Sequence, residues 1–153
     1  MVGAAGPGPL MASAKRLLGS VRLATGRSKE GLMLCEESVR MAEATKNVAL
    51  LKNSQLALAE ARLDTGDAAG AKALAADLAR YFAGKRQGES ELEALALAWS
   101  ASQGRERASY AERAQTRLDK LRQDWGAEAF TSFTSRPDIR TILQKSSLLT
   151  KAN

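Results

Sequence analysis

The sequence predicts an all-α protein built as a stack of helix hairpins, the architecture called an α-solenoid. Alanine, leucine, arginine, lysine and glutamate dominate its 153 residues, whereas the strand formers valine, isoleucine and threonine are scarce. Apolar residues recur three and four positions apart through most of the chain, as in helices that pack on one side. Nearly the same five residues occur twice, RLATG at Arg22–Gly26 and RLDTG at Arg62–Gly66. Together these observations favour helices joined by recurring glycine turns.

The first hairpin is predicted over about residues 11–46. Its first helix takes its apolar face from Leu17, Leu18 and Val21. Gly26 is expected to end that helix, because glycine adopts the left-handed conformation of a helix C-terminus at little cost. Ser28 can then cap the second helix. The second helix is expected to bury Leu32, Cys35, Val39 and Ala42.

Two further hairpins are predicted over about residues 47–87 and 88–125. Gly66 ends the first helix of one, and Asp67 can accept hydrogen bonds from the free amides of the next helix. Gly104 is expected to be the turn of the other, so the turn glycines lie 40 and 38 residues apart. The side chains expected in the core are Leu51, Leu58, Ala61, Ala71, Leu74, Leu78, Phe82, Leu92, Leu95, Ala96, Trp99, Ala111, Ala114, Leu118, Leu121 and Trp125. Helix pairs repeated at this period are typical of a solenoid.

The pattern changes after Trp125, and residues 126–145 are expected to cap the open end of the stack. One short amphipathic helix is expected around Phe130, with Ala129 and Phe133 on its apolar face. Pro137 and Asp138 suit the first turn of a second one, which carries Ile139, Ile142 and Leu143.

The two ends of the chain read as flexible. Residues 1–10 contain the run Gly6-Pro7-Gly8-Pro9 and are expected to be a lead-in, and residues 146–153 a polar tail. The start lacks the basic leader and apolar stretch of a signal peptide, and no apolar run reaches the length of a membrane span. A cytoplasmic protein without membrane contact is therefore expected.

The composition argues against an enzyme. The chain has no histidine, the commonest general base and metal ligand, and its single cysteine cannot build a thiolate metal site. Cys35 lies on a helical apolar face and is expected to be a structural thiol. The acidic run Glu89, Glu91 and Glu93 spreads around a helix and is expected to be solvated. We therefore expect no catalytic residue, no metal and no cofactor.

The segment LALAEARLDTGDAAGAKALAADLARYF, at residues 56–82, resembles a tetratricopeptide repeat. The matching residues are Leu58, Ala59, Gly66, Asp67 and Ala71, together with Leu18, Gly19 and Gly26 in the first copy. The copies exceed the family's period of about 34 residues, and they look more like the extended variant of bacterial regulators and signalling proteins. The ending from Trp125 is similar to the W-G…F…R-P-D-I segment that closes such repeats in large multidomain bacterial proteins. The resemblance implies a right-handed α-α superhelix, either by itself or as part of such a larger protein. Another α-solenoid or an irregular helical bundle is the alternative.

The resemblance also implies a scaffold that binds a helix or an extended peptide of a protein partner in a concave groove. Groove positions carried over from the family are Arg16, Ser20 and Leu23, then Asn53, Leu56, Glu60 and Leu63, then Ala94, Ala98 and Ala101. Ser20 and Glu60 do not fit the carboxylate clamp of chaperone-binding members. The sequence names no particular partner.

Nucleic-acid binding is the alternative, because the formal charge is +6 and residues 105–153 carry +4 of it. The basic residues concerned are Arg105, Arg107, Arg113, Arg117, Lys120 and Arg122. Acidic residues share the same helix, among them Glu106, Glu112, Asp119 and Asp124, and no motif that enters a nucleic-acid groove is present. A protein partner is therefore the leading hypothesis.

Overall fold

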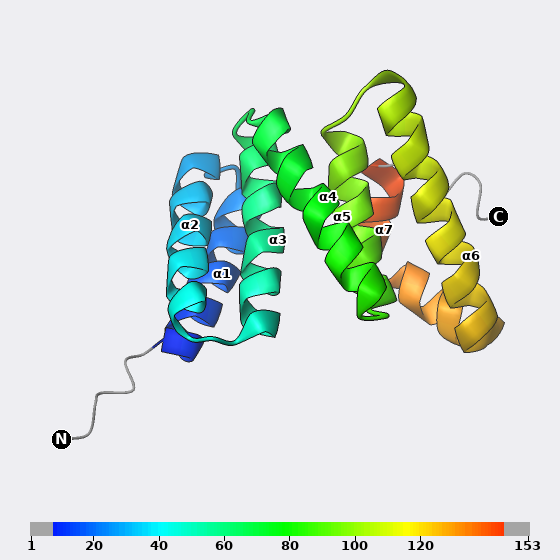
Figure 1. Cartoon of the computed structure of the whole chain (residues 1–153), viewed down its shortest axis with the longest axis horizontal. Coiled ribbons are helices and arrows are strands. Elements are labelled where there is room, and N and C mark those ends of the chain that lie inside the picture. The colour runs from blue at the N-terminus through cyan, green and yellow to red at the C-terminus, as the bar shows by residue number, and fades with distance from the viewer. Residues whose placement is uncertain (1–7, 146–153) are drawn as a thin grey trace. The chain divides into compact units, whose positions relative to one another are not determined.

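The computed structural model describes residues 8–145, and all secondary structure in this range is helical (Figure 1). The helices are α1 (Gly8–Ala24), α2 (Ser28–Ala44), α3 (Val48–Asp64), α4 (Ala68–Gly84), α5 (Gly88–Ser100), α6 (Gly104–Ser135) and α7 (Pro137–Lys145). The all-α class is confirmed for this part of the chain. Since α1 begins at Gly8, the last three residues of the predicted lead-in are helical. The rest of the lead-in and the tail at 146–153 lie outside the described residues.

The chain packs as two compact units that divide within α4, between Leu74 and Ala75. In unit 1, α1 packs on α2 and on α3, and α2 packs on α3. In unit 2, α5 packs on α6, and α7 packs on both. The sequence predicted one repeat domain over residues 11–145, so the division within α4 is a feature that the repeat pattern did not predict.

Two of the three predicted glycine turns are confirmed. Gly26 and Gly66 have φ of +77° and +92°. The Gly26 amide donates to the Leu23 carbonyl at 3.0 Å and the Arg27 amide to the Arg22 carbonyl at 2.8 Å, and the same two bonds recur at Gly66. This is the Schellman pattern that closes a helix. Gly104 differs: α5 already ends at Ser100, and Gly104, with φ +59°, is the first residue of α6.

The turn after α4 has the same hydrogen bonds without a glycine. The Gln87 amide donates to the Phe82 carbonyl at 3.0 Å and the Arg86 amide to the Ala83 carbonyl at 3.2 Å. Arg86 occupies the left-handed position with φ +56°. A side chain with a β-carbon is strained there, so this turn is less favourable than those at Gly26 and Gly66.

Helices α1 and α2 approach each other closely at two glycines. A β-carbon on Gly19 would lie 2.8 Å from the Cys35 Sγ and 3.2 Å from the Gly31 carbonyl oxygen, so only a hydrogen atom fits. The buried residues of α1 are accordingly Ala12, Gly19 and Leu23. The prediction that Leu17, Leu18 and Val21 form the inward face is wrong, because these side chains are 55%, 43% and 54% exposed.

The core of unit 1 is formed by buried residues of α1, α2 and α3. It consists of Leu23, Cys35, Ala57, Leu58 and Ala61, with the half-buried Leu32, Val39 and Leu74 packed against it. Leu51 is half-buried and Ala42 is buried, so the predicted inward faces of α2 and α3 are confirmed in the main.

In unit 2, the predicted core positions of α5 and α6 are mostly buried. Leu92, Leu95 and Leu118 are almost fully inaccessible to solvent. Gly126 interrupts α6 with φ +80°, so that the helix bends where the sequence pattern changes. Trp125, expected in the core, is 43% exposed and meets the Phe133 ring edge-on at 5.2 Å.

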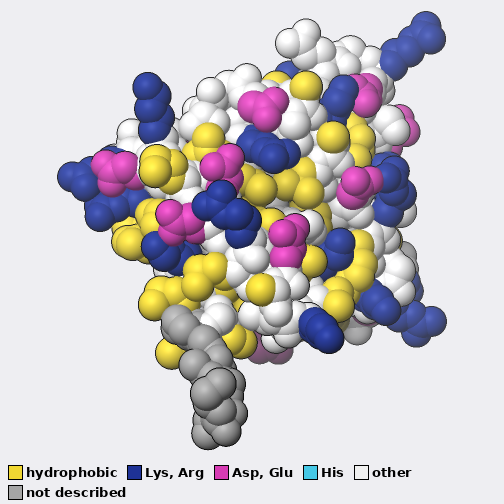
Figure 2. Space-filling view, turned by 60° about the vertical axis from the view of Figure 1, so that its left-hand side comes forward, with side chains coloured by type: hydrophobic (Ala, Val, Ile, Leu, Met, Phe, Trp, Pro, Cys, Tyr) yellow, Lys and Arg dark blue, Asp and Glu magenta, His cyan; other side chains and the backbone are white. Residues whose placement is uncertain are grey.

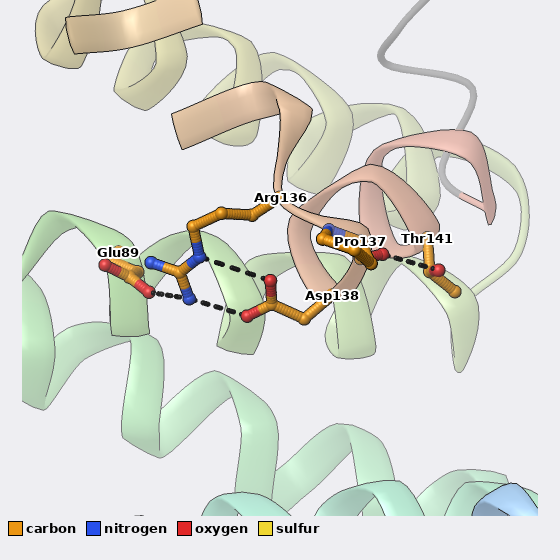
Figure 3. A network of polar contacts seen from close by, with 5 residues as sticks. All are labelled: Glu89, Arg136, Pro137, Asp138 and Thr141. Carbon is orange, nitrogen blue, oxygen red and sulfur yellow. Dashed lines mark hydrogen bonds and ion pairs between the residues drawn. The ribbon is translucent and has the colours of Figure 1, made fainter. Parts of the chain in front are cut away.

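The two predicted C-terminal helices are present as the last part of α6 and as α7. Phe130 and Phe133 are buried in the first, and Ile139 and Leu143 in the second, whereas Ala129 is exposed. The link between them begins with Arg136, which forms ion pairs to Glu89 of α5 at 2.8 Å and to Asp138 at 2.6 Å (Figure 3). The hydrogen bonds that Arg136 donates to Asp138 lower the pKa of the Asp138 carboxyl. Arg136 therefore fastens the start of α7 to α5.

The left-handed turn residues allow a stability prediction. Arg86→Gly should raise the free energy of unfolding by about 1 kcal/mol, because it removes the strain of a β-carbon at positive φ. Gly66→Ala should lower it by a similar amount. Thermal and urea unfolding followed by circular dichroism measure both. Lys85→Gly is the matched control, since its backbone is not left-handed and the substitution should not stabilise. A less stable Arg86→Gly protein would contradict the prediction.

Candidate partner-binding site

The predicted groove residues of unit 1 lie on α1 and α3, two helices that pack against each other. On α3, Asn53 and Glu60 are exposed, and Leu56 and Leu63 are half-buried. These four are spaced by three and four positions and share one face of the helix. On α1, Arg16 and Ser20 are half-buried. These six residues, from here the α1–α3 face, offer apolar, amide, hydroxyl and charged groups to a partner.

The remaining predicted positions need correction. Leu23 is only 7% exposed and belongs to the core of unit 1. Ala94 and Ala98, which lie on α5 in unit 2, are fully buried, so their side chains cannot line an open groove. Ala101 is half-buried at the end of α5. Six of the ten predicted groove residues therefore lie at the surface of α1 and α3, whereas Leu23, Ala94 and Ala98 are buried.

Opposite charges flank the core beneath the α1–α3 face. Arg16 and Glu60 both act electrostatically on Cys35, so both charges lie near the buried thiol. Burial and, to a smaller extent, Glu60 raise the pKa of Cys35 to about 11, although Arg16 opposes the rise. The thiol is therefore protonated at neutral pH and a poor nucleophile, as expected for a structural cysteine.

Arg16 also has an unused donor. Its Nε is buried and donates no hydrogen bond within the described residues. A buried donor without an acceptor carries a free-energy cost.

A pair of buried serines fixes the helices below this face. The Ser38 hydroxyl of α2 donates to the Ala12 carbonyl of α1 at 2.7 Å, and the Ser54 hydroxyl of α3 lies 2.8 Å from Ser38 Oγ. Because Ser38 uses its proton on the carbonyl, Ser54 is the donor to Ser38. Both side chains are fully buried. Sequence reasoning missed them, although each occupies an inward position of a predicted helix.

The acidic run at the start of α5 is not solvated throughout, contrary to expectation. Glu91 is 7% exposed and forms an ion pair with Arg117 of α6 at 2.5 Å. Glu89 pairs with Arg136 (Figure 3). These acids hold the helices of unit 2 together, so they are not candidates for acid–base chemistry.

The basic residues of α6 are largely engaged by the protein itself. Arg117 pairs with Glu91, and Lys120 pairs with Asp124 at 2.9 Å. Arg107 lies over the Trp99 ring at 3.7 Å, Arg113 over Tyr110 at 5.5 Å and Arg122 over Phe130 at 5.9 Å. A phosphate-binding surface would have to compete with these contacts.

Between residues 8 and 145, no three aspartate, glutamate, cysteine or histidine residues gather as a metal site would require. Across the same range, no helix combines the length and the apolar character needed to cross a membrane.

The fold and the α1–α3 face define an all-helical protein with a mixed apolar and polar surface on two packed helices. Comparison of the chain with protein-family models, with curated proteins and with solved structures finds no match.

The serine pair generates a double-mutant prediction. Ser38→Ala should lower the free energy of unfolding by about 1–3 kcal/mol, because it leaves the Ser54 hydroxyl buried without a partner. Ser54→Ala should cost less, since Ser38 keeps its bond to the Ala12 carbonyl. The double variant should lose less than the two single losses together. Additive losses in urea unfolding would show that the two hydroxyls do not interact.

Cys35 generates a pH prediction. Its pKa is about 11 in the folded protein against 9.0 for the free thiol, so the unfolded chain releases its proton first. The thiol's contribution to stability is therefore complete below pH 9 and is lost as pH rises towards 11. Urea unfolding of the wild type and of Cys35→Ala across this range should give a stability difference that shrinks with pH. Parallel curves for the two proteins would contradict this.

Proposed function

We propose that this chain is a non-catalytic protein-interaction module that binds a helix or an extended peptide on its α1–α3 face. The interpretation follows the tetratricopeptide-like pattern of the sequence: helix hairpins stacked as a right-handed solenoid, acting in the cytoplasm as a scaffold or as the scaffolding part of a larger bacterial regulator or signalling protein.

The observation that carries the proposal is the character of α3 and its neighbour α1. Leu56 and Leu63 are half-buried two turns apart, and they alternate along α3 with the exposed Asn53 and Glu60. Half-buried apolar residues framed by polar ones suit the core and the rim of an interface. On α1, the half-buried Arg16 adds a positive charge to the same face.

A protein partner has more support than a nucleic acid. Five of the six basic residues named for nucleic-acid binding lie against an acid or an aromatic ring of the same chain. Binding to phosphates depends on free cations and falls steeply with salt.

Paired variants test the proposal. Affinity capture from native extract with the wild type should retain a protein that Arg16→Glu and Leu63→Glu each lose, because the first reverses a charge and the second places a charge on an apolar contact. Circular dichroism checks that both variants fold. Arg40→Glu, an exposed charge reversal on α2, is the control and should retain the partner.

Two outcomes would contradict the proposal. Capture that is unaffected by both variants would place the partner elsewhere. Salt-sensitive retention of duplex or single-stranded DNA, together with no captured protein, would favour the nucleic-acid alternative.

A further inference from the structure

Helix α1 has its polarity reversed relative to an ordinary surface helix. The side chains that face away from α2 and α3 are all apolar: Leu10, Met11, Ala14, Leu17, Leu18 and Val21. Their exposed fractions reach 81% at Leu10 and exceed one third at all six. With 3.6 residues per turn they cover a sector of roughly 120° that contains no charged residue. We call these six residues the α1 outer face.

The outer face is also exceptional in size for a helix that faces water. Its side chains expose on the order of 500 Å², which is near the upper end for the largest apolar patch of a monomeric protein. Figure 2, in which the N-terminal side of the molecule comes forward, shows hydrophobic side chains gathered beside the place where the described chain begins. A patch of this kind marks an interface.

The charges of α1 are turned away from the outer face. Lys15 pairs with Glu37 of α2 at 2.6 Å, and Arg22 pairs with Glu30 of α2 at 3.3 Å. Arg16 lies on the side of Cys35 and Glu60. An anionic membrane would be met by free cations beside the apolar sector, but here the flanking cations already have partners. A neutral, apolar surface is therefore the complementary one.

We propose that the α1 outer face binds the same face of a second copy of this chain, with the two α1 helices antiparallel. Met11, Ala14, Leu18 and Val21 follow the a and d spacing of a coiled coil, and in an antiparallel pair a residues meet d residues. Aligning the two helices about a twofold axis places Met11 opposite Val21 and Ala14 opposite Leu18. Each larger side chain then faces a smaller one, which is the arrangement that fills a packed core.

The outer face supplies a large part of the area that a stable dimer needs, and neighbouring residues of α2 add to it. A standard interface buries about 800 Å² on each partner, and the outer face supplies more than half of that as apolar surface. Leu34 and Met41 of α2, each one turn after an acid that pairs with α1, are half-buried and extend the surface along the hairpin. Because the interface is symmetric, every contact occurs twice.

This interface is separate from the proposed partner site. Arg16 and Ser20, the α1 residues of the α1–α3 face, lie outside the sector of the outer face. A dimer formed through the outer face therefore presents two α1–α3 faces at once, which would raise the avidity for a partner with two binding segments.

Sedimentation velocity of the full chain over a concentration series tests the proposal. The wild type should form a dimer. Met11→Glu and Val21→Lys should each raise the dimer dissociation constant by a factor on the order of 100, because symmetry places two charges in the apolar interface. Ala129→Glu is the control, since Ala129 is exposed on α6 in the other unit, and it should leave the dimer unchanged. Circular dichroism confirms that each variant is folded.

Charge pairing tests the orientation. Met11→Glu combined with Val21→Lys in one chain should restore the dimer, because each Glu then faces a Lys of the other copy. Mixing the two single variants should give a heterodimer. Single variants that are monomeric and are not rescued in either way would overturn the antiparallel arrangement.

Three other results would overturn the proposal. One is a wild type that stays monomeric at every concentration. Another is a monomeric wild type that binds anionic phosphatidylserine vesicles but not neutral ones. The third is a protein that dimerises only after residues 1–7 are removed, which would assign the outer face to that segment.

Discussion

The close approach of α1 and α2 at Gly19 and Gly31 is the constraint on which the rest of unit 1 depends. A β-carbon added to Gly19 would lie only 2.8 Å from the Cys35 Sγ, so the two backbones leave no room for a larger side chain. Such proximity lets the Ser38 hydroxyl reach the Ala12 carbonyl across the helices. It also decides the rotation of α1, because small residues must occupy the contact. The bulky apolar residues of α1 are then left on the opposite side.

That rotation explains which parts of the fold could be predicted from sequence. The ends of helices could be predicted, since Gly26, Gly66 and Pro137 have local conformational requirements that the residue type alone reveals. The face of α1 that points into the core could not be predicted in this way. Periodicity locates an apolar stripe but does not tell whether it points inward, and in α1 the stripe of large residues and the stripe of small ones compete. The side of α1 with the small residues is the buried one, because α1 and α2 can approach each other closely only where the side chains are small.

The candidate site was predictable in part for a similar reason. Carrying groove positions from one hairpin to the next assumes that every hairpin packs in the same way. The assumption places six of the predicted residues on α1 and α3, which pack together. It does not hold for α5 and α6, because α5 has 13 residues and α6 has 32, whereas α1 and α2 have 17 each. Ala94 and Ala98 are consequently buried. The Glu91–Arg117 pair, which spans α5 and α6, could not be inferred from either helix alone.

Helix α1 separates its charges from its large apolar residues and leaves the apolar residues facing water, which gives it an unusual energetic balance. Lys15 and Arg22 gain ion pairs with α2 that are partly exposed and therefore individually weak. The six apolar residues gain nothing from facing water. In isolation α1 would thus be held mainly by its contact at Gly19, by the buried serines and by Leu23. An apolar partner on the outer face would bury the large side chains of α1 that the core of unit 1 leaves exposed. Association would then also stabilise this helix against unfolding.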